Sequence, residues 1–499
     1  MDFVLPTDRD RITIAILALG GEGGGVLAEW IQELARSNGY VAQGTSVPGV
    51  AQRTGSTVYY IELIRAGAGG ANRPDPVLAM MPVPGDVDIV IASELMEAGR
   101  AILRGFVSED RTTLIGSTHR VYAISEKSAM GDGTGAGQRI LDAAGRRAQR
   151  FIGFDMAAAA GKAGSVISSV MFGALAGSDA LPFPRETFEG TIRHSGKAVE
   201  ANLKGFGLGF TRAQEGDPAA AEAAGPAEPT TEAGRALKAR VEALLPEAAH
   251  TLAIEGVRRL MDYQDRAYAE FYLNRLARLT ELDDGADDWR LTREGARHLA
   301  LWMAYEDTIR VADLKVRATR STRVEAEVRL APDQVMTVTE YMHPRLQEVA
   351  ETLPAAIGSL ILGSGTLRRW LEPRFAKGRH VETTSLRWFL MLRLLASLRG
   401  MRRSTLRYAQ EQERIDDWLT LAHEAARSDC EAAAEILACQ QLIKGYSDTF
   451  ERGLDNFATV MAEARKAIGA PGAAARIAAL RAAAIADDQG KALACAVAG

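Results

Sequence analysis

The sequence predicts an open, mostly parallel α/β sheet followed by a mainly α-helical C-terminal domain. Residues 11 to about 210 alternate short β-rich runs with amphipathic helical runs, a pattern typical of a parallel sheet covered by helices. Residues beyond about 235 are rich in Leu, Ala and Arg and have few β-branched clusters, which favours helices. A chain of 499 residues is also too long for a single core.

The boundary between the two parts is expected in a stretch of unusual composition. Residues 213–234 are rich in Ala, Pro, Glu and Gly and show no apolar periodicity, which predicts a flexible linker. We therefore expect an α/β domain over 1–212 and a helical domain over 235–499. The sequence shows no fixed-period repeat, so a solenoid is not favoured.

A glycine-rich turn separates the first expected strand from the first expected helix. An apolar run over 12–19 predicts the strand, and apolar residues at helical spacing over 26–38 predict a helix that stops at Gly39. The turn between them reads Gly20-Gly21-Glu22-Gly23-Gly24-Gly25. A strand, a glycine turn and a helix N-terminus can present backbone N–H groups to an anionic or polar ligand. A purely structural tight turn explains the local sequence equally well.

The remaining strands of the sheet are expected in five β-rich runs. They lie at 40–42, 57–64, 87–92, 112–116 and 150–154. The run over 87–92 is apolar enough for a strand that helices cover on both faces.

The glycine turn does not have the spacing of a common nucleotide-binding loop. Glu22 interrupts the G-x-G-x-x-G frame, and no acidic residue follows the next expected strand, where a ribose would need one. No Gly-Lys-Ser/Thr sequence completes a P-loop. Another glycine pair, in Gly131-Asp132-Gly133, is not followed by paired asparagines that would hold Mg²⁺ and thiamine diphosphate, and we interpret it as a surface loop.

A second segment, at Gln52, Arg53 and Thr54, is a candidate for anion binding. A guanidinium fork flanked by small and amide side chains can bind a phosphate or a carboxylate, although a solvated loop arginine explains the local sequence as well. Its combination with the glycine turn makes both segments candidate cofactor-binding residues: Gly20, Gly21, Glu22, Gly23, Gln52, Arg53 and Thr54. Glu22 would repel a phosphate unless it is protonated or paired, for example with Arg53.

Metal and catalytic clusters are not indicated. Only three cysteines occur, Cys430, Cys439 and Cys495, so this chain alone cannot build a four-cysteine iron–sulfur site. The seven histidines show no metal or nucleophile spacing. We expect no catalytic residue and no metal ligand in this chain.

Charge and composition restrict the partners. A formal charge of -5 argues against a general nucleic-acid binder, and no apolar stretch is long enough to span a bilayer. The N-terminus lacks a basic region followed by a cleavage site, so we expect a cytoplasmic protein. The Arg- and Leu-rich stretch from Trp388 to Tyr408 predicts either a membrane-surface helix or, in better agreement with an acidic chain, a helix packed within its own domain or on an acidic partner.

Residues 11 to about 210 resemble the gamma domain of the 2-oxoacid:ferredoxin oxidoreductases, a Rossmann-like fold. That family has a loop of the type Gly-x-Gly-Gly-Gln-Gly after its first strand, where this chain has Ala18 in place of the first glycine and Glu22 in place of the glutamine. The family's Arg-Gly-Gly signature has its counterpart at Arg53, with Thr54 replacing a glycine. Further matches are Asp88 to Arg100 and Met171 to Phe183. The long helical extension resembles that of the beta subunit of the indolepyruvate ferredoxin oxidoreductase group.

The resemblance implies oxidative decarboxylation of an arylpyruvate or another 2-oxoacid to an acyl-CoA, CO₂ and reduced ferredoxin. Thiamine diphosphate, Mg²⁺ and [4Fe-4S] clusters are expected on a large partner subunit of a hetero-oligomer, because this chain lacks their signatures. Coenzyme A is expected at the interface that the subunits share. The alternative is a non-catalytic interaction or regulatory protein that keeps the fold, which the departures at Ala18, Glu22 and Thr54 favour.

Overall fold

The computed structural model describes eleven stretches of the chain, and the chain divides into two compact units, Met1–Ala223 and Ala224–Gly499. The described residues are 11–48, 56–66, 78–122, 126, 137–215, 228–328, 330, 333–343, 345–375, 378–487 and 489–498. The expected linker over 213–234 lies largely outside them, at 216–227. At its two ends, helix α8 continues to Glu215 and helix α9 begins at Glu232.

The first unit contains a six-stranded sheet with the strand order β2-β3-β1-β4-β5-β6. Strands β1, β4, β5 and β6 are parallel to one another, as the sequence predicts. The strands are β1 (Arg11–Leu19), β2 (Tyr40–Pro48), β3 (Ser56–Arg65), β4 (Ile89–Ala92), β5 (Thr113–Ser117) and β6 (Arg150–Phe154).

The sheet has one antiparallel edge, which the sequence pattern did not reveal. Strand β3 pairs antiparallel with both β1 and β2. Only residues 49–55 connect β2 to β3, and a parallel connection needs a dozen or more residues to cross the sheet. The short connection therefore forces β3 to turn back between β2 and β1.

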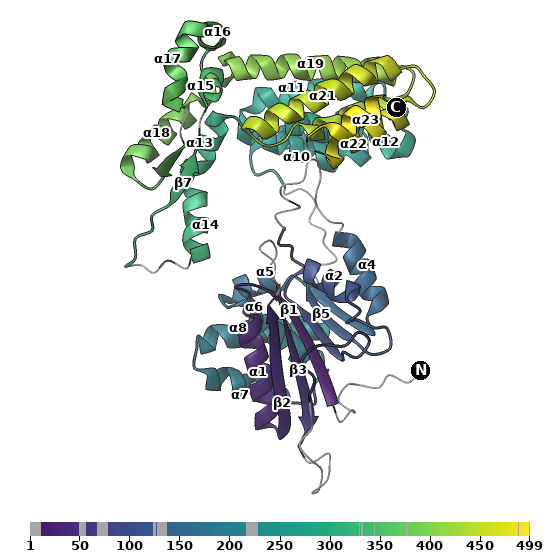
Figure 1. Ribbon diagram of the computed structural model, residues 1–499, viewed down its shortest axis with the longest axis vertical. Helices are drawn as coiled ribbons and strands as arrows, with labels where there is room; N and C mark the ends of the chain where they lie inside the picture. Colours follow the sequence, from purple (N-terminus) through teal and green to yellow (C-terminus); the bar gives the residue numbers. More distant parts are fainter. Residues whose placement is uncertain are drawn as a thin grey trace. The chain divides into compact units, whose positions relative to one another are not determined.

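Helices cover both faces of the sheet (Figure 1). Ile12, Ile14 and Ile16 of β1 point to the face covered by α1, α6, α7 and α8, whereas Ala15 and Leu17 point to the face covered by α2 and α4. This alternation is the two-residue period of a strand buried on both sides. The helices are α1 (Gly24–Ser37), α2 (Leu95–Leu103), α4 (Gly137–Arg147), α5 (Met156–Ala163), α6 (Ile167–Gly177), α7 (Arg185–Ser195) and α8 (Val199–Glu215).

The second unit is mainly helical, as predicted, and its main core lies between its first four and its last five α-helices. Trp302 and Trp418 are fully buried there, with ring centroids 5.1 Å apart. These helices are α9 (Glu232–Leu244), α10 (Glu247–Tyr263), α11 (Arg266–Thr280), α12 (Ala286–Met303), α19 (Leu406–Ala426), α20 (Cys430–Ala438), α21 (Ser447–Ala467), α22 (Ala473–Ala486) and α23 (Lys491–Ala498), with a 3-10 helix η4 (Cys439–Leu442).

A smaller lobe of the second unit lies between α12 and α19 in the chain. Its helices are α13 (Thr308–Val316), α14 (Ala318–Val328), α15 (Leu346–Thr352), α16 (Ala355–Gly363), α17 (Gly365–Phe375), α18 (Leu386–Ser397) and the 3-10 helix η3 (Leu398–Ser404). It also contains an antiparallel pair, β7 (Thr339–Met342) and β8 (Arg379–Glu382), which the sequence did not predict. Strands of four residues are too short for a period-2 pattern to be recognised.

Within the described residues, no single helix has both the length and the apolar composition needed to cross a bilayer. Helices α5 and α6 reach that composition only together, and the pair is bent by 113°.

Candidate functional site at the carboxyl edge of the sheet

The glycine turn lies at the carboxyl end of β1, where it leads directly into α1. Gly21 and Gly23 adopt positive φ angles of 90° and 72°, a left-handed conformation that glycine accepts without strain. The N–H of Glu22 donates to the carbonyl of Leu19 over 3.1 Å, which closes the turn. Gly23 is the N-cap of α1, and no side chain accepts a hydrogen bond from the first N–H groups of the helix.

Two of the glycines are also required by close packing. A Cβ on Gly24 would lie 2.6 Å from the Cβ of Ala18 and 2.7 Å from a ring carbon of Tyr59. A Cβ on Gly23 would lie 2.8 Å from the hydroxyl of Ser168. The turn therefore fits between β1, β3 and α6 only because these positions lack side chains.

Glu22 binds two side chains that follow neighbouring strands. Its Oε2 accepts a hydrogen bond from the hydroxyl of Ser93, the residue after β4. Its Oε1 lies 3.5 Å from Nε2 of His119, two residues after β5. Both members of this pair are largely buried, with 18% and 15% of their side chains exposed for Glu22 and His119. The carboxyl ends of three parallel strands are thus joined through one carboxylate.

The other nitrogen of His119 is held by β5 itself. Its Nδ1 lies 2.7 Å from the hydroxyl of Ser117, which also accepts the N–H of Met156 over 3.0 Å. When Ser117 donates its proton to Nδ1, the neutral ring carries its own proton on Nε2, facing Glu22. Glu22, His119 and Ser117 thus form a continuous row of polar contacts along this edge of the sheet.

Two buried glutamates, Glu94 and Glu97, follow Ser93 closely in the chain. Glu94 caps α2 by accepting the N–H of Glu97 over 3.0 Å, and Glu97 lies 3.0 Å from Arg100. Burial raises the pKa of both carboxyls, and the charge of Glu22 raises that of Glu94 further. Arg100 in turn donates to the hydroxyl of Ser56 at the start of β3 over 2.5 Å.

The candidate residues from the sequence are only partly covered by the structure. Gly20, Gly21, Glu22 and Gly23 lie together at the sheet edge. Gln52, Arg53 and Thr54 lie outside the described residues, as do Gly131, Asp132 and Gly133. An Arg53 partner for Glu22 therefore stays a prediction.

Ser93, Ser117 and His119 were not among the candidate residues. A usable signal existed, because all three residues lie at or within a few residues of the end of an expected parallel strand, and such strand ends meet at one edge of the sheet.

The described residues contain no group of three His, Cys, Asp or Glu side chains placed to hold a metal ion. Cys439 is fully buried, and burial raises the pKa of its thiol to about 12. Cys430 donates to the carbonyl of Leu282, and Cys495 is exposed. These thiols do not fit a cluster site.

Two families match the chain. Residues 13–212 match the pyruvate ferredoxin/flavodoxin oxidoreductase family, and residues 249–463 match a family of unknown function, DUF6537. Over 210 residues the chain is 30% identical to the indolepyruvate oxidoreductase subunit IorB of Pyrococcus horikoshii, which covers 40% of this chain and 96% of that subunit.

Three solved structures are similar to part of the chain. The pyruvate oxidoreductase subunit PORC of Thermotoga maritima is 17% identical, with a TM-score of 0.29, over 41% of this chain and 97% of that one. A keto/oxoacid ferredoxin oxidoreductase gamma subunit of Geobacter sulfurreducens is 15% identical, with a TM-score of 0.28, over 42% and 98%. The 2-oxoglutarate:ferredoxin oxidoreductase of Magnetococcus marinus is 13% identical, with a TM-score of 0.30, over 42% and 32%.

Proposed function

The chain belongs to the pyruvate ferredoxin/flavodoxin oxidoreductase family, and from this premise we propose that it is the subunit without clusters of an indolepyruvate ferredoxin oxidoreductase. The observation that carries the proposal is the 30% identity to an indolepyruvate oxidoreductase subunit over 96% of that subunit's length. The reaction would convert an arylpyruvate and coenzyme A to an acyl-CoA and CO₂, with ferredoxin as the electron acceptor.

The proposed complex assigns the redox chemistry to a larger partner subunit. Thiamine diphosphate with Mg²⁺ and [4Fe-4S] clusters would supply decarboxylation and electron transfer there. The chain's own cysteines do not fit a cluster, and this supports the division of labour.

The contribution of this chain is proposed at the carboxyl edge of its sheet, where ligands of open α/β sheets bind. The glycine turn leaves the start of α1 without a capping side chain, so its N–H groups are available to an anionic group. Glu22 and His119 lie 3.5 Å apart at this edge. Arg53, on sequence grounds, would add a guanidinium for the phosphates of coenzyme A.

Affinity purification from the native host tests the proposed assembly. The proposal predicts that the chain is recovered with a larger subunit that contains iron and acid-labile sulfide. Recovery of the chain alone under mild conditions would contradict it. In the purified complex, Arg53→Ala is expected to raise the KM for coenzyme A. An unchanged KM would show that Arg53 does not bind coenzyme A.

A second candidate function is a non-catalytic interaction protein. It is favoured by the contacts of the Glu22 carboxylate, which Ser93 and His119 of the same chain already bind. This candidate predicts a stable complex with a partner that lacks iron and sulfide. The metal and sulfide content of the co-purified partner therefore separates the two functions.

A further inference from the structure

A cavity of about 1400 Å³ lies in the smaller lobe of the helical unit. Most of its walls come from α13, α14, α15 and α18 and from the β7–β8 pair, and Arg407 of α19 and residues at and just before the start of α21 complete them. Small-molecule sites usually enclose roughly 300–1,000 Å³, so this cavity has room for a ligand larger than one aryl 2-oxoacid. It lies in the part of the chain that matches the family of unknown function.

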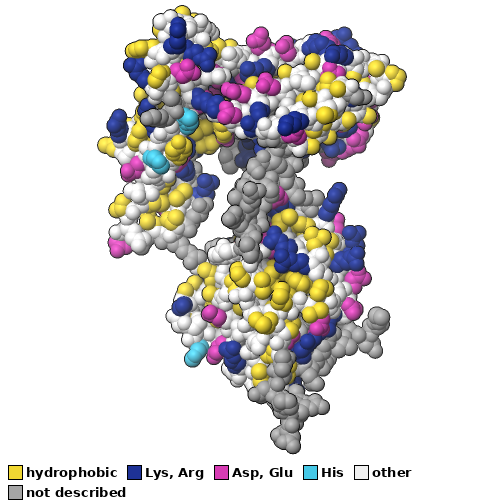
Figure 2. Space-filling model, viewed as in Figure 1, with side chains coloured by type: hydrophobic (Ala, Val, Ile, Leu, Met, Phe, Trp, Pro, Cys, Tyr) yellow, Lys and Arg dark blue, Asp and Glu magenta, His cyan; other side chains and the backbone are white. Residues whose placement is uncertain are grey.

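One wall of the cavity is apolar. Ala312 of α13 packs against Leu392 of α18, and both are buried. Trp388, Met391 and Leu395 of α18 continue this wall along the cavity. Met391 is 43% exposed, so the apolar wall is accessible from solvent. Figure 2 shows hydrophobic side chains among Lys and Arg side chains on this lobe.

Another wall carries more positive than negative charge. Lys315 of α13 and Arg320 of α14 both line the cavity and both contact a single carboxylate, that of Glu340 on β7. The Arg320–Glu340 distance is 2.7 Å, and all three side chains are at least three-quarters buried. Burial lowers the pKa of Lys315, and the neighbouring Arg320 lowers it further. Two cations thus share one anion in a partly desolvated wall.

Two other arginines that line the cavity, Arg407 and Arg345, have carboxylate partners of their own. Arg407 lies 3.0 Å from Glu351 and 2.9 Å from Glu411. Arg345 lies 2.8 Å from Asp448. Lys315 and Arg320 differ from these two arginines because they share a single carboxylate.

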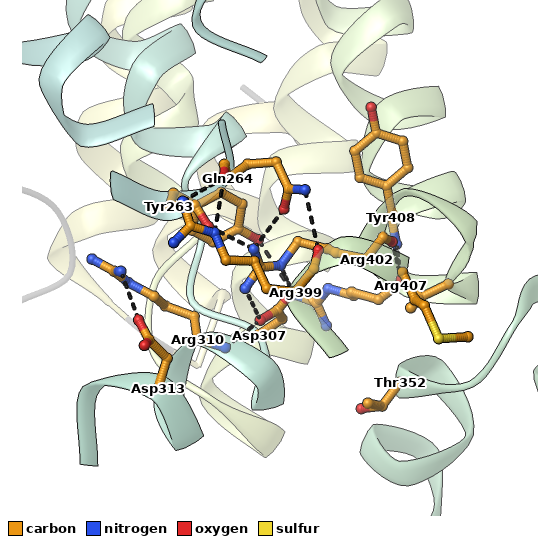
Figure 3. A network of polar contacts seen from close by, with 12 residues as sticks. Tyr263, Gln264, Asp307, Arg310, Asp313, Thr352, Arg399, Arg402, Arg407 and Tyr408 are labelled. Carbon is orange, nitrogen blue, oxygen red and sulfur yellow. Dashed lines mark hydrogen bonds and ion pairs between the residues drawn. The ribbon is translucent and has the colours of Figure 1, made fainter. Parts of the chain in front are cut away.

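A buried polar network holds the start of α13, one of the helices that line the cavity. Arg402 of η3 is only 2% exposed and donates to Asp307 over 2.7 Å, to the carbonyl of Tyr263 over 2.6 Å and to Gln264 over 2.8 Å (Figure 3). Asp307 is the N-cap of α13 and accepts the N–H of Arg310 over 2.7 Å. The network joins α10, α13 and η3, so contacts within the protein hold the start of α13 in place.

We propose that this cavity binds an amphipathic organic anion. Its carboxylate or phosphate group would lie at Lys315 and Arg320, where a second anion balances the charge. Its apolar body would lie along Trp388, Met391 and Leu392. The described residues that line the cavity all belong to the second unit, so this proposal stands apart from the proposed oxidoreductase reaction.

Calorimetric titration of the full-length protein with dodecanoate tests the site. We expect saturable binding with one molecule per chain, weaker binding of the uncharged decyl maltoside and no binding of acetate. Lys315→Gln combined with Arg320→Gln should weaken dodecanoate binding roughly tenfold to a hundredfold, because it removes the charge-assisted hydrogen bonds. Arg368→Gln, an exposed change on α17, is the control and should leave the affinity unchanged. Dodecyl phosphate, titrated in parallel, distinguishes a phosphate from a carboxylate preference.

A second variant keeps the test valid if the double variant fails to fold. Met391→Glu places a negative charge at an accessible wall position and should abolish dodecanoate binding without disturbing the core. Equal binding of dodecanoate and decyl maltoside would overturn the proposal, since it would indicate an apolar surface without anion preference. Absence of saturable dodecanoate and dodecyl phosphate binding would overturn it as well.

Discussion

The carboxylate of Glu22 lies 3.5 Å from Nε2 of His119, and the two residues come from the ends of different parallel strands. Glu22 also accepts a hydrogen bond from the hydroxyl of Ser93. A residue that departs from the family's glutamine is thus held by partners within its own chain. This relationship joins the glycine turn to the ends of β4 and β5.

The Glu22 contacts predict a difference between two substitutions. Glu22→Gln keeps an oxygen for Ser93 and should change the kcat/KM of the reconstituted complex by no more than about twofold. Glu22→Ala removes both contacts and should lower kcat/KM about tenfold or more. Steady-state assays of the complex measure both, and Glu29→Ala, an exposed change on α1, is the control. An unchanged Glu22→Ala complex would show that the carboxylate has no role in the shared site.

The close packing at Gly24 predicts an effect on stability. Gly24→Ala places a Cβ against Ala18 and Tyr59 and should lower the free energy of unfolding of the first unit by about 1–3 kcal/mol. The matched control is Gly25→Ala, whose Cβ would lie 3.5 Å from the hydroxyl of Tyr59, an ordinary contact. Urea unfolding followed by circular dichroism compares the two. Equal stability of both variants would mean that the turn can shift to accept the methyl group.

The buried Glu94 predicts a pH dependence. Burial, and then the Glu22 charge, raise its pKa in the folded state above that in the unfolded chain. Such a carboxyl destabilises the fold as the pH rises from the unfolded pKa, about 4.3, through the folded pKa. Glu94→Gln has no carboxyl to titrate, so its stability relative to the wild type should increase as the pH rises above about 4.3 and through the raised pKa of Glu94. Hydrogen exchange of the α2 amides in both proteins measures the difference, and parallel pH profiles would refute the argument.

The two neighbouring arginines Arg402 and Arg403 predict unequal costs. Arg402→Leu leaves Asp307 buried without its partner and should destabilise the helical unit by about 3–5 kcal/mol. Arg403 is 42% exposed and pairs with Asp265 at the surface, so Arg403→Leu should cost less than about 1 kcal/mol. Thermal unfolding by calorimetry compares them. A small cost at Arg402 would imply that α13 is held by other contacts.

The sequence was informative where structure is local. The apolar run, the glycines and the helical spacing predicted β1, the turn and α1, because each pattern lies within a few residues. The sequence pattern did not predict the antiparallel placement of β3 or the short strands β7 and β8, because their pairing depends on connection length and tertiary contacts. The sequence pattern did not connect Ser93 and His119 with Glu22, because they lie 71 and 97 residues away along the chain. Only the order of the strands in the sheet brings them into contact.

The most direct test of the proposed function is a reaction of the complete complex. The chain, co-purified with its larger partner, is supplied with coenzyme A, oxidised ferredoxin and indolepyruvate, pyruvate or 2-oxoglutarate, and ferredoxin reduction is followed by absorbance. The proposal predicts reduction that depends on both subunits, with a kcat/KM for indolepyruvate about tenfold or more above that for the other two acids. A complex that reduces no ferredoxin with any 2-oxoacid, although its clusters are intact, would contradict it.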